Sequence, residues 1–207
     1  MARTTQERAV RTRESILRAA AEVLDEYGFA GASITKIAER AGATTGAMYF
    51  HFKSKEGLAQ AVMNAQPDTI VPLLQSQGLQ RLVDITLVWS RQLQEDALLR
   101  AAVRLAVEQG AFGMRDDTSY RTWMRIMTEC LLDARDRGEL LESTDPVEVA
   151  EFVVGACTGI QLYSQLVSGR ADLPERTVAM WRYLLPGVAV PAVAERIELA
   201  TDRASSV

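Results

Sequence analysis

The sequence predicts an all-α protein, in which a head of three helices precedes a larger helical bundle. Apolar residues recur along most of the chain at three- and four-residue intervals, the spacing of one helical face. Glycine and proline interrupt this pattern where helices would end, and no alternating run bounded by hairpin turns stands out. With 207 residues, 48% of them hydrophobic, the chain can bury a substantial core. We expect a head at residues 1–55 and a body at residues 56–207.

The head begins with a predicted helix from Gln6 to Tyr27, whose apolar residues share one face. Gly28 supplies the left-handed conformation that ends a helix. A second helix is expected from Ser33, whose hydroxyl is a good N-cap, to Ala41. Gly42 then breaks this helix and permits a sharp turn.

A third, short helix is predicted from Thr44 or Thr45 to about Phe50, and a fourth from Lys55 to about Gln66. The second and third helices, joined by Ala41-Gly42-Ala43, have the form of a helix-turn-helix, in which the latter helix enters the DNA major groove. The side chains expected to wedge these helices together are Ile34, Ile37, Ala38, Ala47, Met48 and Phe50.

The body contains helices that are longer and more apolar than those of the head. Their predicted ranges are 79–95, 97–109, 119–137, 146–168, 174–185 and 191–202. Asp145 as N-cap, with Pro146 at the first helical position, opens the helix at 146–168. No internal repeat or low-complexity segment is visible in this part.

The composition argues against an enzyme. His51 is the single histidine, which excludes metal sites built from several histidines and leaves one candidate for a catalytic triad. No nucleophile elbow and no phosphate-binding glycine loop occurs. We therefore expect no catalytic residue, no cofactor and no metal. Cys130 and Cys157 lie in apolar helical patterns and are expected to be lone buried thiols.

Charge is distributed unevenly along the chain. Residues 1–55 carry nine basic and six acidic side chains, whereas the remainder carries 14 basic and 21 acidic ones. A basic head on an acidic body suggests that the head meets a polyanion. No stretch of twenty residues lacks charge, and the first residues form no apolar signal region, so we expect a cytoplasmic protein with no membrane partner.

The predicted third helix has the side chains of a DNA-reading element. Thr44, Thr45 and Gly46 lie at its N-terminal tip, where unpaired backbone N–H groups favour phosphate. Near the next turn, three groups of side chains can donate hydrogen bonds to backbone phosphates. They are the hydroxyl of Tyr49, the imidazole of His51, and the ammonium groups of Lys53 and Lys55.

The run from Ile34 to Leu58 closely resembles the signature of the TetR family of bacterial repressors, and Tyr27-Gly28-Phe29 matches the end of that family's first helix. The resemblance implies a homodimer that binds a palindromic operator in double-stranded DNA, with a C-terminal domain for a small-molecule inducer. It places Thr44, Tyr49, His51 and Lys55 on phosphates, Thr45 and Gly46 on base edges, and Ser33 and Lys36 beside the groove. The helices at 146–168 and 174–185 are the candidates for the dimer interface.

One position departs from the TetR pattern. Many relatives carry lysine between the hydroxyl residue and the glycine of the recognition helix, where this chain has Thr45. The change removes one cation and one long hydrogen-bond donor. The operator sequence and the salt dependence of binding therefore do not carry over from those relatives.

A narrower resemblance connects the chain to the γ-butyrolactone-type autoregulator receptors of actinomycetes, which sense small lactone or butenolide signals. The segments that carry it are Arg8–Arg13, Gly46–Phe52, Arg100–Leu105, Tyr120–Trp123, Gly159–Gln161 and Leu184–Pro191. Such receptors control antibiotic production and morphological development, a form of quorum sensing. By this likeness Trp123 covers the ligand, Thr158 hydrogen-bonds it, and Gln66 links the pocket to the head.

Residue types in the body agree with a site for a mostly apolar ligand, which needs aromatic walls and a few hydrogen-bonding groups. Trp89, Trp123, Thr158, Gln161 and Gln66 supply that combination. The sequence thus predicts a repressor released by a small hydrophobic ligand, with secondary metabolism as its target. Two alternatives stay open: a TetR-like repressor of efflux or catabolic genes, and a helical small-molecule-binding protein without DNA binding.

Overall fold

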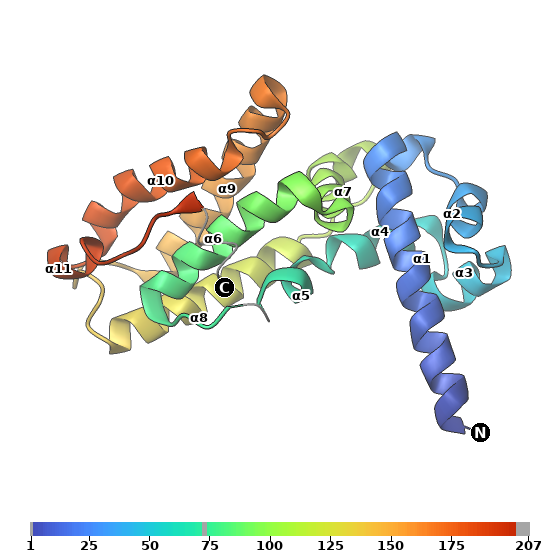
Figure 1. Cartoon of the computed structure of the whole chain (residues 1–207), viewed down its shortest axis with the longest axis horizontal. Helices are drawn as coiled ribbons and strands as arrows, with labels where there is room; N and C mark the ends of the chain where they lie inside the picture. The colour runs from blue at the N-terminus through green and yellow to red at the C-terminus, as the bar shows by residue number, and fades with distance from the viewer. Residues whose placement is uncertain (1, 72–73, 202–207) are drawn as a thin grey trace. The chain divides into compact units, whose positions relative to one another are not determined.

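The computed structural model describes residues 2–71 and 74–201 (Figure 1). Within these ranges the chain is helical and forms no strand, and the one isolated β-bridge joins Leu140 to Ala189. The all-α prediction is therefore confirmed. In the same ranges, no helix is both long enough and apolar enough to cross a membrane.

The chain forms two compact units, which are described separately. The first comprises Met1–Gln66 and Asp96–Ser119, and the second comprises Pro67–Glu95 and Tyr120–Val207. The helices of the first unit are α1 (Ala2–Gly31), α2 (Ile34–Ala41), α3 (Thr45–Phe52), α4 (Lys55–Met63), α7 (Ala97–Glu108) and the 3-10 helix η2 (Gln109–Phe112). Those of the second are α6 (Gly78–Glu95), α8 (Thr118–Asp136), α9 (Pro146–Ser168), α10 (Leu173–Val188) and α11 (Pro191–Ala194), and the short α5 (Gln66–Ile70) begins at the boundary. The division of function expected after residue 55 stays a prediction.

The core of the first unit forms around α1, which packs against α2, α4 and α7. Ile16 and Leu24 of α1, Ile37 of α2 and Leu58 of α4 are fully buried there. Because these residues recur at helical spacing, the apolar stripe read from the sequence is the face that α1 turns inward.

Helix α7 is fastened to α1 by two arginines that meet Asp25. The Arg100 Nε donates a hydrogen bond to the Asp25 carboxylate at 2.8 Å, and the Arg104 Nη1 donates to the Asp25 backbone carbonyl at 2.9 Å. Next to this contact, Gly28 takes φ 67° and kinks α1. The backbone conformation requires glycine at this position, and a Cβ would in addition lie 2.7 Å from Arg104 Nη2, so the guanidinium would have to shift.

Hydroxyl side chains begin the helices of the head. The Oγ atoms of Ser33, Thr44 and Ser54 accept hydrogen bonds from the backbone N–H groups of Lys36 (3.2 Å), Ala47 (3.1 Å) and Gly57 (3.0 Å). Gly42 ends α2 in the left-handed conformation, with φ 62°. The turn between α2 and α3 is therefore specified by local chemistry.

In the second unit, α10 packs against both α6 and α9. Trp181 of α10 is fully buried, and its indole N–H donates a hydrogen bond to the Thr86 hydroxyl of α6 at 2.7 Å. Both cysteines are buried and unpaired, as predicted. Burial raises the pKa of the Cys130 thiol to about 11 and that of Cys157 to about 12, so both thiols stay protonated.

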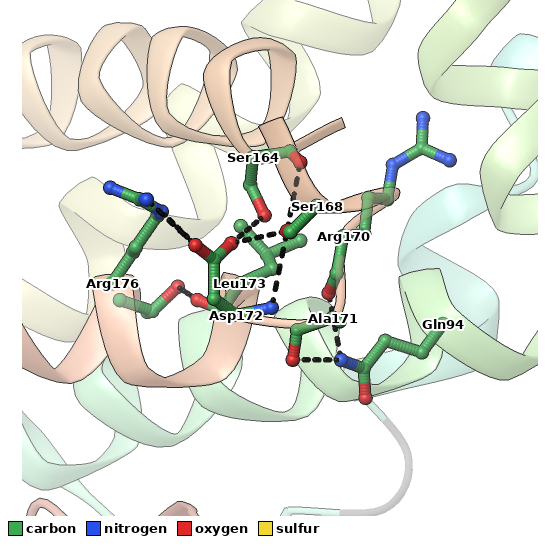
Figure 2. Close-up of polar contacts among 9 residues, drawn as sticks. Gln94, Ser164, Ser168, Arg170, Ala171, Asp172, Leu173 and Arg176 are labelled. Carbon is green, nitrogen blue, oxygen red and sulfur yellow. Dashed lines mark hydrogen bonds and ion pairs between the residues drawn. The ribbon is translucent and has the colours of Figure 1, made fainter. Parts of the chain in front are cut away.

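The connection between α9 and α10 is held by a cluster around Asp172 (Figure 2). The hydroxyls of Ser164 and Ser168 donate to Asp172 Oδ1 at 2.6 and 2.7 Å, and the Arg176 Nε donates to Oδ2 at 2.8 Å. These partners, Arg176 first, hold the pKa of Asp172 well below its usual range. On the other side, the Gln94 amide of α6 donates to the carbonyl of Arg170 at 2.8 Å.

Some helix ends differ from the prediction. The first helix continues through the kink at Gly28, and the third ends at Phe52 rather than Phe50. The helix predicted at 191–202 is wrong, because α11 ends at Ala194. The Gln80 side chain of α6 instead binds the Glu198 backbone: its amide oxygen accepts from the N–H at 2.9 Å and its amide nitrogen donates to the carbonyl at 3.2 Å. Contacts from a distant helix thus take the hydrogen bonds that a longer helix would have made.

Candidate nucleic-acid interface

The outward face of α3, together with the residue that directly follows the helix, carries five of the residues at the candidate DNA-reading surface. They are Thr45, Gly46, Tyr49, Phe50 and Lys53, all exposed. On the opposite face Met48 and Phe52 are buried, with 2% and 6% of their surface accessible. Since residues four apart lie on one side of a helix, this pair anchors α3 to the unit and leaves the other side open.

The prediction that Phe50 belongs to the wedge is wrong, because its side chain is 71% exposed. Two residues after Met48, it is rotated by about 200° around the helix axis and therefore points away from the core. Phe52 takes the inward place, and the Arg13 guanidinium lies 5.1 Å from the centre of its ring. Ile37, Ala38 and Met48 are buried as expected.

The tip of α3 is formed by Thr44, Thr45 and Gly46, which are all exposed. The Thr44 hydroxyl oxygen accepts from the Ala47 N–H, so this side chain both caps the helix and lies at its surface. The first N–H groups of a helix have no partner within it and point along the axis, an arrangement that favours an anion. The tip therefore has the geometry and the partial charge to meet a phosphate.

The start of α4 sits close against the end of α3. A Cβ at Gly57 would collide with the carbonyl oxygen of Phe52, so only glycine allows this approach. Lys53 connects the two helices with φ 67°, and its N–H donates to the Tyr49 carbonyl at 3.1 Å. The direction of α3 is fixed from both ends by these features.

The predicted cations and the imidazole lie against aromatic rings. The Lys36 ammonium is 4.2 Å from the centre of the Tyr27 ring, and that of Lys55 is 4.3 Å from the centre of the Phe29 ring. His51 is half-buried, with its ring edge-on to Phe50 at 5.1 Å between centroids. Ring contacts of this kind restrict the side chains and leave their charges at the surface.

Not every basic group of the head is available to a polyanion. Arg40 forms ion pairs with Glu22 at 3.0 Å and Glu26 at 3.4 Å, and these hydrogen bonds raise the pKa of the guanidinium. Ser33 is exposed, but its hydroxyl oxygen already accepts from the Lys36 N–H. Fewer basic side chains are therefore available to a polyanion than the number of basic residues in the head suggests.

The residues predicted to bind ligand are mostly inside the protein. Trp89, Trp123 and Gln161 of the second unit are buried, and Gln66 of the first unit is buried with its amide donating to the Met63 carbonyl at 3.1 Å. Thr158 is half-buried; its hydroxyl donates to the Val154 carbonyl at 2.9 Å. The structure does not test their role, which stays a prediction.

Tyr120 is a neighbour of this group that sequence reasoning missed. Its hydroxyl is hydrogen-bonded to Thr158; burial raises the pKa of Tyr120 and this hydrogen bond opposes the rise. Tyr120 precedes Trp123 by three residues on α8, a helical spacing that puts both on one face and could have revealed it.

Helices α9 and α10 expose large apolar side chains. Leu166 is 85% and Tyr183 is 89% exposed, and Phe152, Tyr163 and Val167 are exposed as well. The Arg176 guanidinium lies 4.6 Å from the centre of the Tyr163 ring. An apolar surface of this extent is typical of a face that another protein covers. Among the described residues, no group of three or more His, Cys, Asp or Glu side chains is placed to hold a metal ion.

A helix-turn-helix whose second helix exposes one face, with lysines on the neighbouring segments, has the form of a DNA-binding protein. The chain belongs to the TetR family of bacterial regulatory proteins. The family's N-terminal description, bacterial regulatory proteins of the tetR family, matches residues 16–62, and the tetracyclin repressor-like C-terminal domain matches residues 76–191. The family consists of DNA-binding regulators, which confirms a regulator rather than an enzyme.

Similar proteins extend over nearly the whole chain. The A-factor receptor protein of Streptomyces griseus is 40% identical over 193 residues, 93% of this chain and 69% of the receptor. The crystal structure of TylP, a TetR regulator of Streptomyces fradiae, has a TM-score of 0.87 and 41% identity and covers 98% of this chain and 90% of its own.

Two further solved structures, a receptor and a complex with operator DNA, are similar to this chain. A γ-butyrolactone receptor, described as ArpA-like, has a TM-score of 0.69 and 28% identity over 96% of this chain and 98% of its own. CprB of Streptomyces coelicolor, solved with its operator sequence, has a TM-score of 0.72 and 28% identity over 97% of this chain and 99% of its own. The resemblance to autoregulator receptors that the sequence predicted is confirmed.

Proposed function

We propose that the protein is a repressor that binds a palindromic operator as a homodimer and is released by a small hydrophobic ligand. The single observation that carries the DNA-binding part is the exposed tip of α3, built on a rigid turn. In this proposal Thr44, Tyr49, His51 and Lys55 bind phosphates, while Thr45 and Gly46 face base edges. Ser33 and Lys36 flank the groove.

The dimer is proposed to form through α9 and α10. Their exposed apolar side chains, Leu166 and Tyr183 above all, would be covered by the same helices of a second copy. The Asp172 cluster stabilises the connection between the two helices, so both would enter the interface as one piece. A dimer supplies two copies of α3, which a palindromic operator requires.

The ligand is proposed to be a γ-butyrolactone or butenolide, and the regulated genes those of secondary metabolism. Support comes from the A-factor receptor protein and the γ-butyrolactone receptor, whose names state what they bind. Trp89 and Trp123 would supply apolar walls, and Thr158 and Gln161 hydrogen bonds. Gln66 lies where α5 begins, between the stretches of sequence proposed to bind DNA and ligand.

Coupling is proposed to run through α6 and α7, which only Asp96 separates in sequence. The Asp96 carboxylate accepts from the Leu98 N–H at 2.7 Å and begins α7. Because Arg100 and Arg104 fasten α7 to α1, a shift of α6 on ligand binding would reach the head. The change in the equilibrium between the DNA-binding and released states can be no larger than the ligand's differential affinity for these two states.

The DNA-binding proposal is tested by selecting duplexes from a random pool with the full chain and measuring affinity against salt concentration. A reader that neutralises phosphates shows a steep negative slope of log affinity against log salt. Tyr49→Phe should weaken binding about fivefold for each half-site on every selected duplex, since it removes one phosphate hydrogen bond worth about 1 kcal/mol from each subunit. No selected sequence and a flat salt response would refute DNA binding.

Ligand release is tested by adding γ-butyrolactones to the complex with a selected duplex and following fluorescence anisotropy. Micromolar lactone should dissociate the wild-type complex. Thr158→Val keeps the side-chain volume but removes the hydroxyl, so about tenfold more lactone should be required. Equal lactone sensitivity of the two proteins would remove Thr158 from the site, and failure of every lactone would reject this ligand class.

A further inference from the structure

Phe50 is the most exposed large apolar side chain of the first unit in the described residues, at 71%. It lies on the outward face of α3, beside Tyr49 and between the tip and Lys53. The core does not require it there, because Met48 and Phe52 anchor the helix. An aromatic ring left in water loses the stabilisation that burial would give, so a partner is expected to cover it.

The Phe50 ring has two neighbouring side chains at the surface. The His51 ring packs edge-on against it at 5.1 Å between centroids. Lys53 reaches back, with Nζ donating to the Phe50 carbonyl at 3.3 Å and lying 6.0 Å from the ring centre. These contacts narrow the space open to the ring, which lowers the conformational entropy that it loses on binding.

The surroundings of the ring indicate the kind of partner. Lys53 beside it and the N–H groups at the tip of α3 both favour a polyanion, so an apolar protein surface is a poor match. Thr45 and Gly46 lie on the same face, but they are short and offer no long donor to base edges. Among the side chains of this face, the Phe50 ring is therefore the one suited to recognise a base by apolar contact.

We propose that Phe50 reads the 5-methyl group of thymine in the major groove of the operator. Thymine alone among the four bases carries a methyl group on that edge, and phenylalanine contacts it through apolar packing. The inference rests on the proposed DNA-binding function and adds a specificity-determining residue to it. It predicts a thymine at the position of each half-site that Phe50 reaches.

The test replaces each thymine of a selected operator by deoxyuridine, symmetrically in both half-sites. Deoxyuridine keeps the base pair and removes only the methyl group. With the full-length wild-type protein, the replacement at one thymine position should weaken binding about fourfold for each half-site. This is the factor that corresponds to the burial of one methyl group. Phe50→Ala should bind the thymine operator roughly tenfold more weakly for each half-site and should no longer distinguish thymine from deoxyuridine at that position.

Leu132→Ala is the matched control, because Leu132 of α8 is 45% exposed and lies outside α3. It should keep the full response to the methyl group. Since Phe50 supports no core, the thermal unfolding of Phe50→Ala should match that of the wild type, which separates base recognition from misfolding.

The proposal is overturned if no thymine replacement changes wild-type affinity, if the selected operators lack thymine in the contacted positions, or if Phe50→Ala keeps the wild-type response. Each of these results is obtained with protein that binds DNA. Failure of DNA binding itself would appear earlier, as the absence of any selected duplex with a salt-dependent affinity.

Discussion

At Gly28, both the backbone conformation and a neighbouring arginine disfavour any other residue. Its φ of 67° with ψ 177° is a conformation that essentially only glycine adopts, and the Arg104 guanidinium lies in the space that a side chain would occupy. The same arginine donates to the Asp25 carbonyl, so the kink in α1 and the contact with α7 depend on one another. A side chain at residue 28 would disturb both.

We expect Gly28→Ala to lower the free energy of unfolding by more than about 1–2 kcal/mol, the cost of ordinary left-handed strain, because φ 67° with ψ 177° is a conformation that essentially only glycine adopts. Gly42→Ala gives the ordinary cost, because Gly42 has φ 62° and ψ 31° with open space around its Cβ position. Gly110→Ala, with neither constraint, should change stability by less than about 1 kcal/mol. Urea unfolding of the three variants gives the comparison. A Gly28→Ala cost no greater than that of Gly42→Ala would contradict this expectation.

At the scale of elements, the connection between α9 and α10 is a charged cluster rather than an apolar one. Asp172 accepts from Ser164, Ser168 and Arg176, and together they hold its carboxylate ionised (Figure 2). The pKa of Asp172 in the folded chain lies below its value in the unfolded chain. The resulting stabilisation is present above the unfolded pKa, about 4, and is lost as pH falls through the folded value.

Asp172→Asn should therefore destabilise the protein at neutral pH. The difference in urea midpoint between wild type and variant should be constant above about pH 5 and should shrink as the pH is lowered below 4. Glu95→Gln is the control, because the Arg91–Glu95 ion pair is exposed and contributes little. A difference between the wild type and Asp172→Asn that grows toward acid pH would contradict this assignment.

At the scale of the whole molecule, the exposed apolar face of α9 and α10 makes the oligomeric state testable. Leu166→Glu places a charge where the proposed partner would pack, so it should yield monomer in sedimentation velocity and weaken operator binding by at least tenfold. Leu132→Glu, an equally polar change on α8, should leave the wild-type state. A dimer that persists in Leu166→Glu would place the interface elsewhere.

The parts of the fold that the sequence predicted are those specified locally. Ser33, Gly42 and Ser54 shape the backbone next to them, and the helices that they delimit lie where expected. The parts that it did not predict depend on distant partners. The end of α11 is decided by Gln80 of α6, and the packing of α7 by Asp25 of α1.

For the candidate site, the helix-turn-helix motif predicted which segment forms the DNA-reading surface. Which side chains of α3 are exposed there follows from the geometry of the helix. Thr45, Gly46 and Tyr49 are exposed, as a reading surface requires. The apolar character of Phe50 predicts an inward position, although its place two residues from Met48 turns it outward. The polar partners of the predicted ligand residues, such as Tyr120 for Thr158, depend on packing between helices that no local pattern contains.

The separation of the two faces of α3 bears on how such a protein can acquire a new operator. Side chains that hold the helix in place point one way, and those that would touch bases point the other. Surface substitutions at Thr45, Gly46 or Phe50 should therefore alter stability by only about 0.5 kcal/mol. Descendants of this gene could explore new target sequences without first gaining spare stability, and selection for recognition could act on those three codons almost independently of selection for folding.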